Sequence, residues 1–177
     1  MLRNNLLYFS SHYTFKDFYF GNREIKIKAF EDRIKSFYIK PIDIMNKNEL
    51  AFAAGVLCIV TIDFLARIQT NSRETSRNVF KTYLEENISE FKNKGDRFYE
   101  EFRCGLLHEG RIKNGGQFTY SLPEVLREEN SIIIINPKLL IKKIEIVLKK
   151  YINELKLNIE KYKLFELLIL KDFEIDF

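Results

Sequence analysis

Residues 50–62 read LAFAAGVLCIVTI, and this apolar run decides the fold of the chain. The run spans thirteen residues between Glu49 and Asp63, whereas a helix needs about 20 apolar residues to cross a bilayer. A helix that is apolar nearly all round is buried on every side. We therefore expect residues 47–69 to form the central helix of a bundle and the protein to have no membrane partner.

The segments around this run have the periodicity of amphipathic helices. Apolar residues recur at steps of three and four over residues 23–40, which predicts a helix that ends before Pro41. Either Asn71 or Ser72 is a suitable N-cap for a third helix. A fourth helix is expected to begin at Gly95.

The pattern changes after the fourth helix. A turn at residues 114–116 (NGG) is followed by two β-prone runs, residues 117–122 and 131–136, which predict a short hairpin or an irregular flap. Near-heptad spacing from Pro137 then predicts a long closing helix, unbroken or broken once, whose one polar interruption is Asn158. Its apolar seam serves either the bundle or a second chain, and consists of Ile144, Leu148, Tyr151, Leu155, Tyr162, Phe165 and Ile169. The expected fold is all-α, a bundle of about five helices with the β-hairpin or flap between the fourth and the last helix.

Composition indicates one domain. The chain has 177 residues, of which 46% are hydrophobic, enough for a sizeable core. No linker or repeat divides it, and residues 1–22 form a poorly periodic N-terminal extension. The N-terminus lacks the pattern of a signal peptide, so we expect a cytoplasmic protein. Cys58 and Cys104 form no metal-ligand cluster with histidine, so we expect free thiols and no metal site.

The charge is mildly basic and unevenly distributed. The net charge is +4, and residues 1–40 hold eight Lys or Arg against four Asp or Glu. This permits a polyanionic partner, but a solvated surface of mixed charges explains it equally.

Residues 98–116, FYEEFRCGLLHEGRIKNGG, are the only stretch that indicates chemistry. His108 is a side chain that can give and take a proton near neutral pH, and Arg103 supplies a positive fork that fits phosphate. On a regular helix a five-residue step separates the two side chains by about 140°, which is poor geometry for gripping one phosphate. Either Gly105 and Gly110 loosen the helix end, or Arg103 of one chain faces His108 of a second copy.

The segment RCGLLHEG, with Arg and His separated by four residues on a late helix of an α-bundle, resembles the HEPN superfamily of nucleotide-binding helical domains. The IDFLAR segment (residues 62–67), FYEEFRCGLLHEGRIK and the following flap are similar to a bacterial branch of uncharacterised HEPN proteins. Residues 24–165 follow the helix order of that superfamily, with sharp identity confined to the second and fourth helices. The resemblance implies a single HEPN-like domain.

The resemblance also implies a homodimeric, metal-independent RNA endonuclease of a toxin–antitoxin or phage-defence system that needs no cofactor. The RNA's own 2′-hydroxyl would attack the phosphate, with His108 as general base or acid and Arg103 stabilising the charge. An antitoxin or a nucleotidyltransferase is an implied partner. Active members usually carry a polar residue directly after the Arg, where this chain has Cys104.

Neighbouring residues have alternative interpretations. Arg103 could pair with Glu100 or Glu109 on its own helix, and His108 could cap the helix C-terminus. Asp63 could orient Arg103 or His108, lie at the surface, or pair with Arg67. Asp63, Cys104 and Glu109 are the candidate supporting residues.

Beyond the motif, Arg111 and Lys113 could follow a phosphate backbone or be solvated loop charges. We assign no role to His12. Three functions remain open: a ribonuclease acting on single-stranded or loop RNA, a degenerate module that binds RNA or a nucleotide, and a helical interaction protein.

Overall fold

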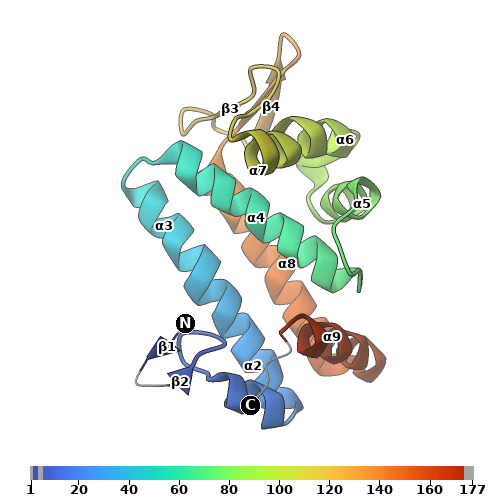
Figure 1. Cartoon of the computed structure of the whole chain (residues 1–177). Coiled ribbons are helices and arrows are strands. Elements are labelled where there is room, and N and C mark those ends of the chain that lie inside the picture. The colour runs from blue at the N-terminus through green and yellow to red at the C-terminus, as the bar shows by residue number, and fades with distance from the viewer. Residues whose placement is uncertain (1, 4–5, 174–177) are drawn as a thin grey trace.

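The structure, a computed structural model, describes residues 2–3 and 6–173. It is mostly helical, as expected, and a small three-stranded sheet lies between α7 and α8 where a hairpin or flap was predicted (Figure 1). The fold is therefore not strictly all-α. The helices are α1 (Phe15–Phe20), α2 (Arg23–Ile34), the π-helix η1 (Lys35–Ile39), α3 (Lys40–Lys47), α4 (Ala51–Gln69), α5 (Arg77–Asn87), the 3₁₀-helix η2 (Ser89–Phe91), α6 (Gly95–Phe98), the π-helix η3 (Tyr99–Cys104), α7 (Gly105–Glu109), α8 (Pro137–Leu157) and α9 (Ile159–Asp172). The strands are β1 (Leu2–Arg3), β2 (Leu6–Leu7), β3 (Gln117–Phe118), β4 (Leu126–Glu129) and β5 (Ile132–Ile135).

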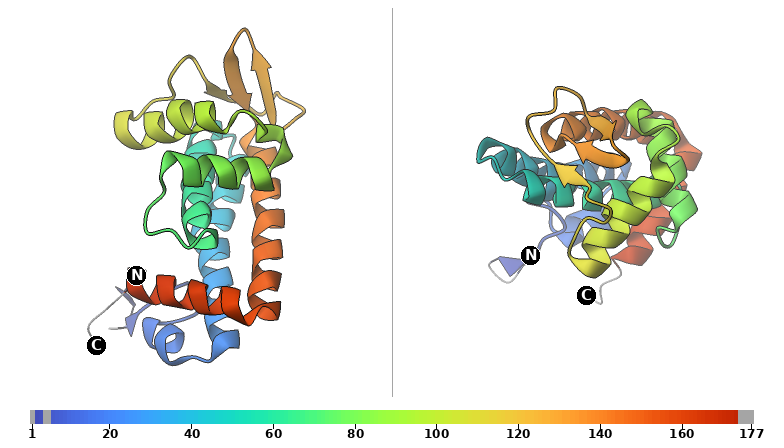
Figure 2. Two further views of the ribbon diagram at one scale, coloured as in Figure 1. Left: turned by 90° about the vertical axis from the view of Figure 1, so that its right-hand side faces the viewer. Right: turned by 90° about the horizontal axis from the view of Figure 1, so that it is seen from above.

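Three long helical segments form the body of the molecule. The continuous rod of α2, η1 and α3 packs beside α4, and α8 lies against α4 (Figure 1). The segment from α6 to α7 and the small sheet cover one end of this body, whereas α9 and α1 lie at the other (Figure 2). The central position expected for the apolar run is therefore the position of α4.

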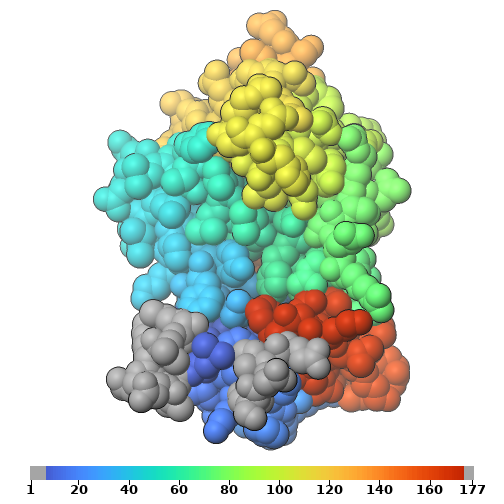
Figure 3. Space-filling view, in the orientation of Figure 1, coloured from blue at the N-terminus to red at the C-terminus, as the bar shows by residue number. Residues whose placement is uncertain are grey.

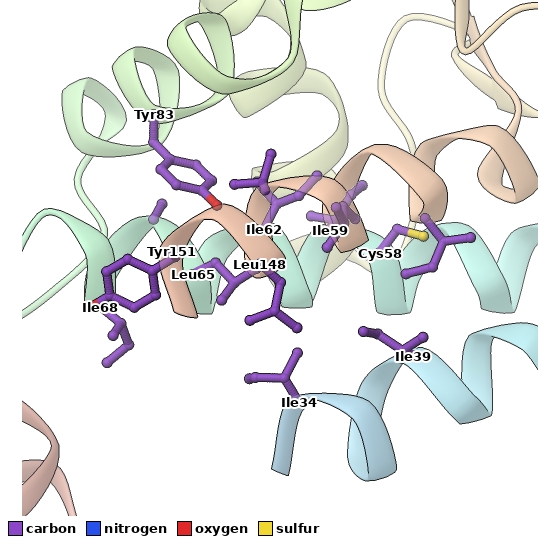
Figure 4. Close-up of a cluster of buried hydrophobic side chains, with 14 of the residues drawn as sticks. Ile34, Ile39, Cys58, Ile59, Ile62, Leu65, Ile68, Tyr83, Leu148 and Tyr151 are labelled. Carbon is purple, nitrogen blue, oxygen red and sulfur yellow. The ribbon is translucent and has the colours of Figure 1, made fainter. Parts of the chain in front are cut away.

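The core is centred on α4, as its apolar sequence predicts. Its side chains Cys58, Ile59, Ile62 and Leu65 are buried against α8 and η1 (Figure 4). Burial raises the pKa of the Cys58 thiol far above its ordinary range, so this cysteine is an inert core residue. By length and composition α4 is the one described helix that is apolar enough to cross a membrane, a property shared by central helices of globular domains.

The long rod passes through a proline, so the prediction that this helix ends before Pro41 is wrong. In η1 the backbone N–H of Lys40 donates to the carbonyl of Lys35, a five-residue step instead of the α-helical four. The wider π-turn directly precedes the proline, whose ring would clash with a regular α-helical turn. The next helix then starts at Ala51 because Glu49 turns the chain with a φ of 57°.

The third helix begins later than either expected N-cap. Asn71 has a φ of 53° and belongs to a turn. The helix α5 starts at Arg77, and the Ser76 hydroxyl caps it by accepting a hydrogen bond from the Val79 N–H at 3.3 Å. The fourth helix does begin at Gly95, as predicted.

The β region has a different pairing from the one expected. The antiparallel hairpin joins β4 to β5 through Asn130 and Ser131, both at positive φ, and β3 pairs with β5 in parallel. The run at 117–122 is therefore not half of the hairpin. Gly55 of α4 lets β3 approach, because a Cβ there would lie 2.4 Å from the Phe118 ring.

The closing helix is broken once, at Asn158. This residue ends α8 and caps α9, since its side-chain oxygen accepts from the Lys161 N–H at 3.0 Å. The predicted seam is buried inside its own chain, with Leu155 and Ile169 fully covered and Tyr151 2% exposed. The seam therefore closes the bundle and is not available to a second chain.

The N-terminal segment packs on the core. The Phe9 and Phe18 rings stack with centroids 4.0 Å apart, and both are fully buried. The Arg33 guanidinium lies over the Phe9 ring and donates a hydrogen bond to the Phe9 carbonyl. Poor periodicity here reflects an irregular path across the end of the bundle.

Candidate active site

The motif lies where the fourth helix crosses α4. In space-filling view the segment around α7 and its following loop lies on the surface above α4 (Figure 3). Arg103 at the end of η3 is half-buried, and its side chain is 15% exposed. Its Nε donates to Asp63 Oδ1 at 3.0 Å. Two segments forty residues apart are thereby joined by an ion pair.

Arg103 and His108 meet within one chain. Arg103 Nη1 lies 3.2 Å from His108 Nε2, so the two side chains meet without a second copy of the chain. Arg103 lies near the end of the π-helix η3, and His108 lies on the following α-helix α7. The contact therefore spans the junction of the two helical segments, and the long arginine side chain reaches the histidine ring.

This contact assigns donor and acceptor roles. A guanidinium has only donors, so in this hydrogen bond Arg103 donates and His108 Nε2 accepts. The arrangement corresponds to the tautomer with its ring proton on Nδ1, in which the Nε2 lone pair faces Arg103. His108 itself is exposed. A substrate phosphate that drew Arg103 away would leave Nε2 free to take a proton.

The charge of Arg103 is well supported. Burial alone would lower the pKa of Arg103, but the hydrogen bond and charge of Asp63 outweigh burial and raise it. Asp63 is held in turn by its helix and by the Thr75 hydroxyl, which donates to the Asp63 carbonyl at 3.2 Å. Of the alternatives for Asp63, the structure has the pair with Arg103, whereas Arg67 pairs with Asp172 at 2.5 Å.

The loop after α7 folds back onto Gly105. The Arg111 N–H donates to the Gly105 carbonyl at 3.1 Å, and a Cβ on Gly105 would lie 2.5 Å from the Arg111 carbonyl oxygen. Gly110 ends the helix in the left-handed conformation, with a φ of 68°. The two glycines therefore turn the chain sharply after the motif, which leaves His108 at an open helix end.

The charged residues around the motif pair with one another. Glu109 accepts from Arg111 Nη2 at 2.8 Å and from Lys113 Nζ at 2.8 Å. Lys113 also reaches Glu100 at 3.0 Å. The hydrogen bond and charge of Lys113, helped by Arg111, lower the pKa of Glu109, although burial acts to raise it. Arg103 pairs with neither glutamate. Arg111 and Lys113 both form ion pairs with Glu109.

Cys104 interacts with the same cluster. Burial first, and then the charge of Cys104, raise the pKa of the Tyr99 hydroxyl, whereas Arg103 lowers it. A hydrogen bond that Arg103 donates to the Cys104 sulfur also contributes to the raised pKa of Arg103. The thiol thus contacts both Tyr99 and Arg103 in the position where the HEPN resemblance leads one to expect a polar residue.

Two residues of the site were missed from the sequence. The Tyr99 ring lies between two guanidinium groups, with Arg77 at 5.3 Å and Arg103 at 5.4 Å from its centroid. Arg77 is exposed and also donates to Glu100 at 2.6 Å. Tyr99 stands four residues before Arg103, which is a usable signal, but Arg77 comes from another helix and no spacing indicates it.

Within the described residues, no three His, Cys, Asp or Glu side chains gather as a metal site. The groups at hand are one base, one buried arginine, one accessory arginine and a supporting carboxylate. This set can bind a phosphate and move one proton.

Comparison of the chain with protein-family models, curated proteins and solved structures gave no match.

Proposed function

We propose that the protein is a metal-independent RNA endonuclease of HEPN type that uses the 2′-hydroxyl of its substrate. The observation that carries the proposal is the contact between Arg103 Nη1 and His108 Nε2 at 3.2 Å, next to the Asp63 ion pair. A neutral imidazole and a buried guanidinium that share one hydrogen bond are placed to act on the same phosphodiester.

The reaction needs one proton transfer and one displacement. A bound phosphate takes up the Nη1 donor of Arg103, which frees His108 Nε2 to accept the proton of the 2′-hydroxyl. The 2′-oxygen then bonds to phosphorus, and the bond from phosphorus to the 5′-oxygen breaks. The leaving oxygen takes a proton from solvent, so the products are a 2′,3′-cyclic phosphate and a 5′-hydroxyl. Arg103 stabilises the charge that develops on the phosphate.

The surroundings favour a flexible RNA substrate. Single-stranded or loop RNA can bring its 2′-hydroxyl into line with the leaving oxygen. Arg77 also lies over the Tyr99 ring, and the half-exposed Arg77 can contact a flanking phosphate. As parts of the same proposal, the enzyme is cytoplasmic, works as a homodimer, and acts as a toxin or defence effector with an antitoxin or nucleotidyltransferase partner.

The test is incubation of purified protein with mixed RNA in EDTA. Variants His108→Ala and Arg103→Ala are expected to lose activity by at least about a hundredfold, because the base or the phosphate ligand is removed. Leu107→Ala changes an exposed neighbour on the same helix and should retain activity. Cleavage by all four proteins would assign the activity to a contaminant, and cleavage by none, with folded protein, would refute the nuclease.

The second candidate is a binding module with the same site. Two features favour it. Cys104 stands where a polar residue is expected, and Arg103 is already paired with Asp63 and His108 when no ligand is bound. In that case Arg103→Ala weakens RNA binding while no product forms. Cys104→Asn separates the two candidates: it should raise cleavage if the residue after the arginine limits catalysis, and should change no product yield in a pure binder.

A further inference from the structure

A second histidine site lies on the N-terminal half of the chain. His12 Nδ1 is 2.9 Å from Asp32 Oδ1, and the His12 backbone N–H donates to Asp32 Oδ2 at 3.1 Å. Asp32 therefore holds His12 by both carboxylate oxygens. The imidazole remains 77% exposed, so its Nε2 faces solvent while Nδ1 is fixed.

The backbone that carries His12 is anchored. Phe9 is fully buried, and its N–H and that of Ser10 both bond to the Tyr13 carbonyl, at 2.9 and 3.1 Å. Thr14 begins α1 in a capping box with Asp17. An exposed ring on a tight, capped turn loses little freedom when it binds a ligand.

Next to this pair the surface is hollowed. A hollow of about 650 Å³ lies between the N-terminal turn and the rod of α2, η1 and α3, within the size range of small-molecule sites. It is lined by Ser11, His12, Asp32, Lys35, Ser36, Lys40, Pro41 and Ile44. The Ser36 hydroxyl is buried and has no hydrogen-bond partner among the described residues. Rotation of this side chain about its Cα–Cβ bond would bring the hydroxyl to an acceptor in the hollow and satisfy it.

The charges suit an anion. Lys40 lines the hollow, is exposed, and makes no ion pair within the described chain. Lys35 also lines it and pairs with Glu31 at 2.5 Å across one helical turn, a contact of low stability at an exposed site. Asp32 is the one carboxylate in the lining, and His12 already occupies both of its oxygens.

We propose that this hollow binds the phosphate group of a phosphate monoester, with the Nε2–H of the His12 imidazolium, the Lys40 ammonium and the Ser36 hydroxyl as donors and Asp32 as the positioning residue for His12. The site shares no residue with the Arg103 and His108 cluster, so it holds or fails independently of the proposed nuclease. Free phosphate and a nucleoside monophosphate present the same chemistry, and the volume admits either.

The chain allows a direct test because it has two histidines. Imidazole NMR signals of the intact protein, assigned with His12→Gln, are followed during titration with inorganic phosphate and, separately, with adenosine monophosphate. His12 signals should move and saturate. Lys40→Ala and Ser36→Ala should weaken the affinity at least about fivefold, because each removes a charged or buried ligand. Asp32→Asn should weaken it while leaving the fold intact.

Lys142→Ala is the matched control, since Lys142 is exposed, unpaired and outside the hollow. If Lys142→Ala and Lys40→Ala lowered the phosphate affinity equally, the effect would be one of nonspecific charge and the proposal would be overturned. Unmoved His12 signals with moving His108 signals would place all phosphate binding at the other site and also overturn it. A stronger response to the nucleotide than to phosphate would identify a nucleotide site, and equal responses a phosphate site.

Discussion

Asp63 and Arg103 form an ion pair at 3.0 Å that connects the central helix α4 to the helix carrying the motif. Both side chains are largely covered, at 21% and 15% exposure. A pair of this kind positions the guanidinium for His108 and also ties the fourth helix to the core.

The coupling between these residues can be measured by a double-mutant cycle. Asp63→Asn, Arg103→Ala and the double variant are compared with the parent protein by chemical denaturation. We expect a coupling free energy of about 1 to 2 kcal/mol, the range for a partly buried, hydrogen-bonded charge pair. Asp63→Asn should also lower RNA cleavage, because Arg103 loses its anchor. Additive effects would mean that the pair does not form in solution.

Gly105 should not tolerate a side chain. In Gly105→Ala the new Cβ would lie 2.5 Å from the Arg111 carbonyl oxygen, so the loop after α7 must move. We expect a loss of about 2 kcal/mol in the free energy of unfolding and a loss of activity, because His108 sits at the displaced helix end. Leu107→Ala on the same helix is the reference, and a fully active Gly105→Ala would contradict the packing described.

Two serines, Ser72 and Ser76, test where the helix α5 begins. Ser76→Ala removes the N-cap hydrogen bond to Val79 and should destabilise the protein by about 1 kcal/mol. Ser72→Ala removes an exposed hydroxyl whose partner is Thr70 and should have an effect near zero. Thermal unfolding of the two variants tests where the helix begins. A larger loss of stability in Ser72→Ala than in Ser76→Ala would show that the helix begins near Ser72.

The helix α9 should contribute to the stability of the fold through its buried face alone. Phe165 is 1% exposed and packs on Phe30 and Tyr151, so Phe165→Ala should cost about 3 to 5 kcal/mol. Leu167 lies on the same helix and is 70% exposed, so Leu167→Ala should change stability little. A large effect at Leu167, accompanied by a change in oligomeric mass, would reveal an interface on the outer face.

Acid should weaken the contact between α2 and α9. Burial opposes the charge of Glu166, but hydrogen bonds from Lys26 and Tyr162 outweigh it and lower the pKa of this carboxyl below its ordinary value of 4.5. A carboxyl with a lower pKa in the folded state stabilises the fold fully above the unfolded pKa, and this stabilisation is lost as the pH falls through the folded pKa.

The size of this effect follows from a comparison with Glu166→Gln. The parent protein should be more stable than the variant by about 1 kcal/mol near neutral pH, and the difference should shrink below about pH 4. Urea denaturation at several pH values measures it. A difference independent of pH would show that the pair with Lys26 does not depend on the carboxylate charge.

Sequence periodicity was sufficient for the central helix, the start of the fourth helix and the closing helical segment, but it left open whether that segment is broken, and the structure places the break at Asn158. These features depend on local patterns, namely apolar steps and residues that cap helix ends. It failed at Pro41, where a local π-turn lets the helical rod continue through the proline. It also failed at the pairing of the strands, because the parallel pairing of β3 with β5 joins residues that are distant in the sequence.

The candidate site divides in the same way. The sequence by itself determined which residues are the candidates for chemistry, since histidine and arginine are scarce or distinctive side chains with defined proton and phosphate chemistry. Only the tertiary structure decided that Arg103 meets His108 within one chain, that Asp63 anchors it, and that His12 is held by Asp32. The physical reason is that a widened helical turn and the packing of one helix across another set side-chain distances, and neither is encoded in the spacing of residues along the chain.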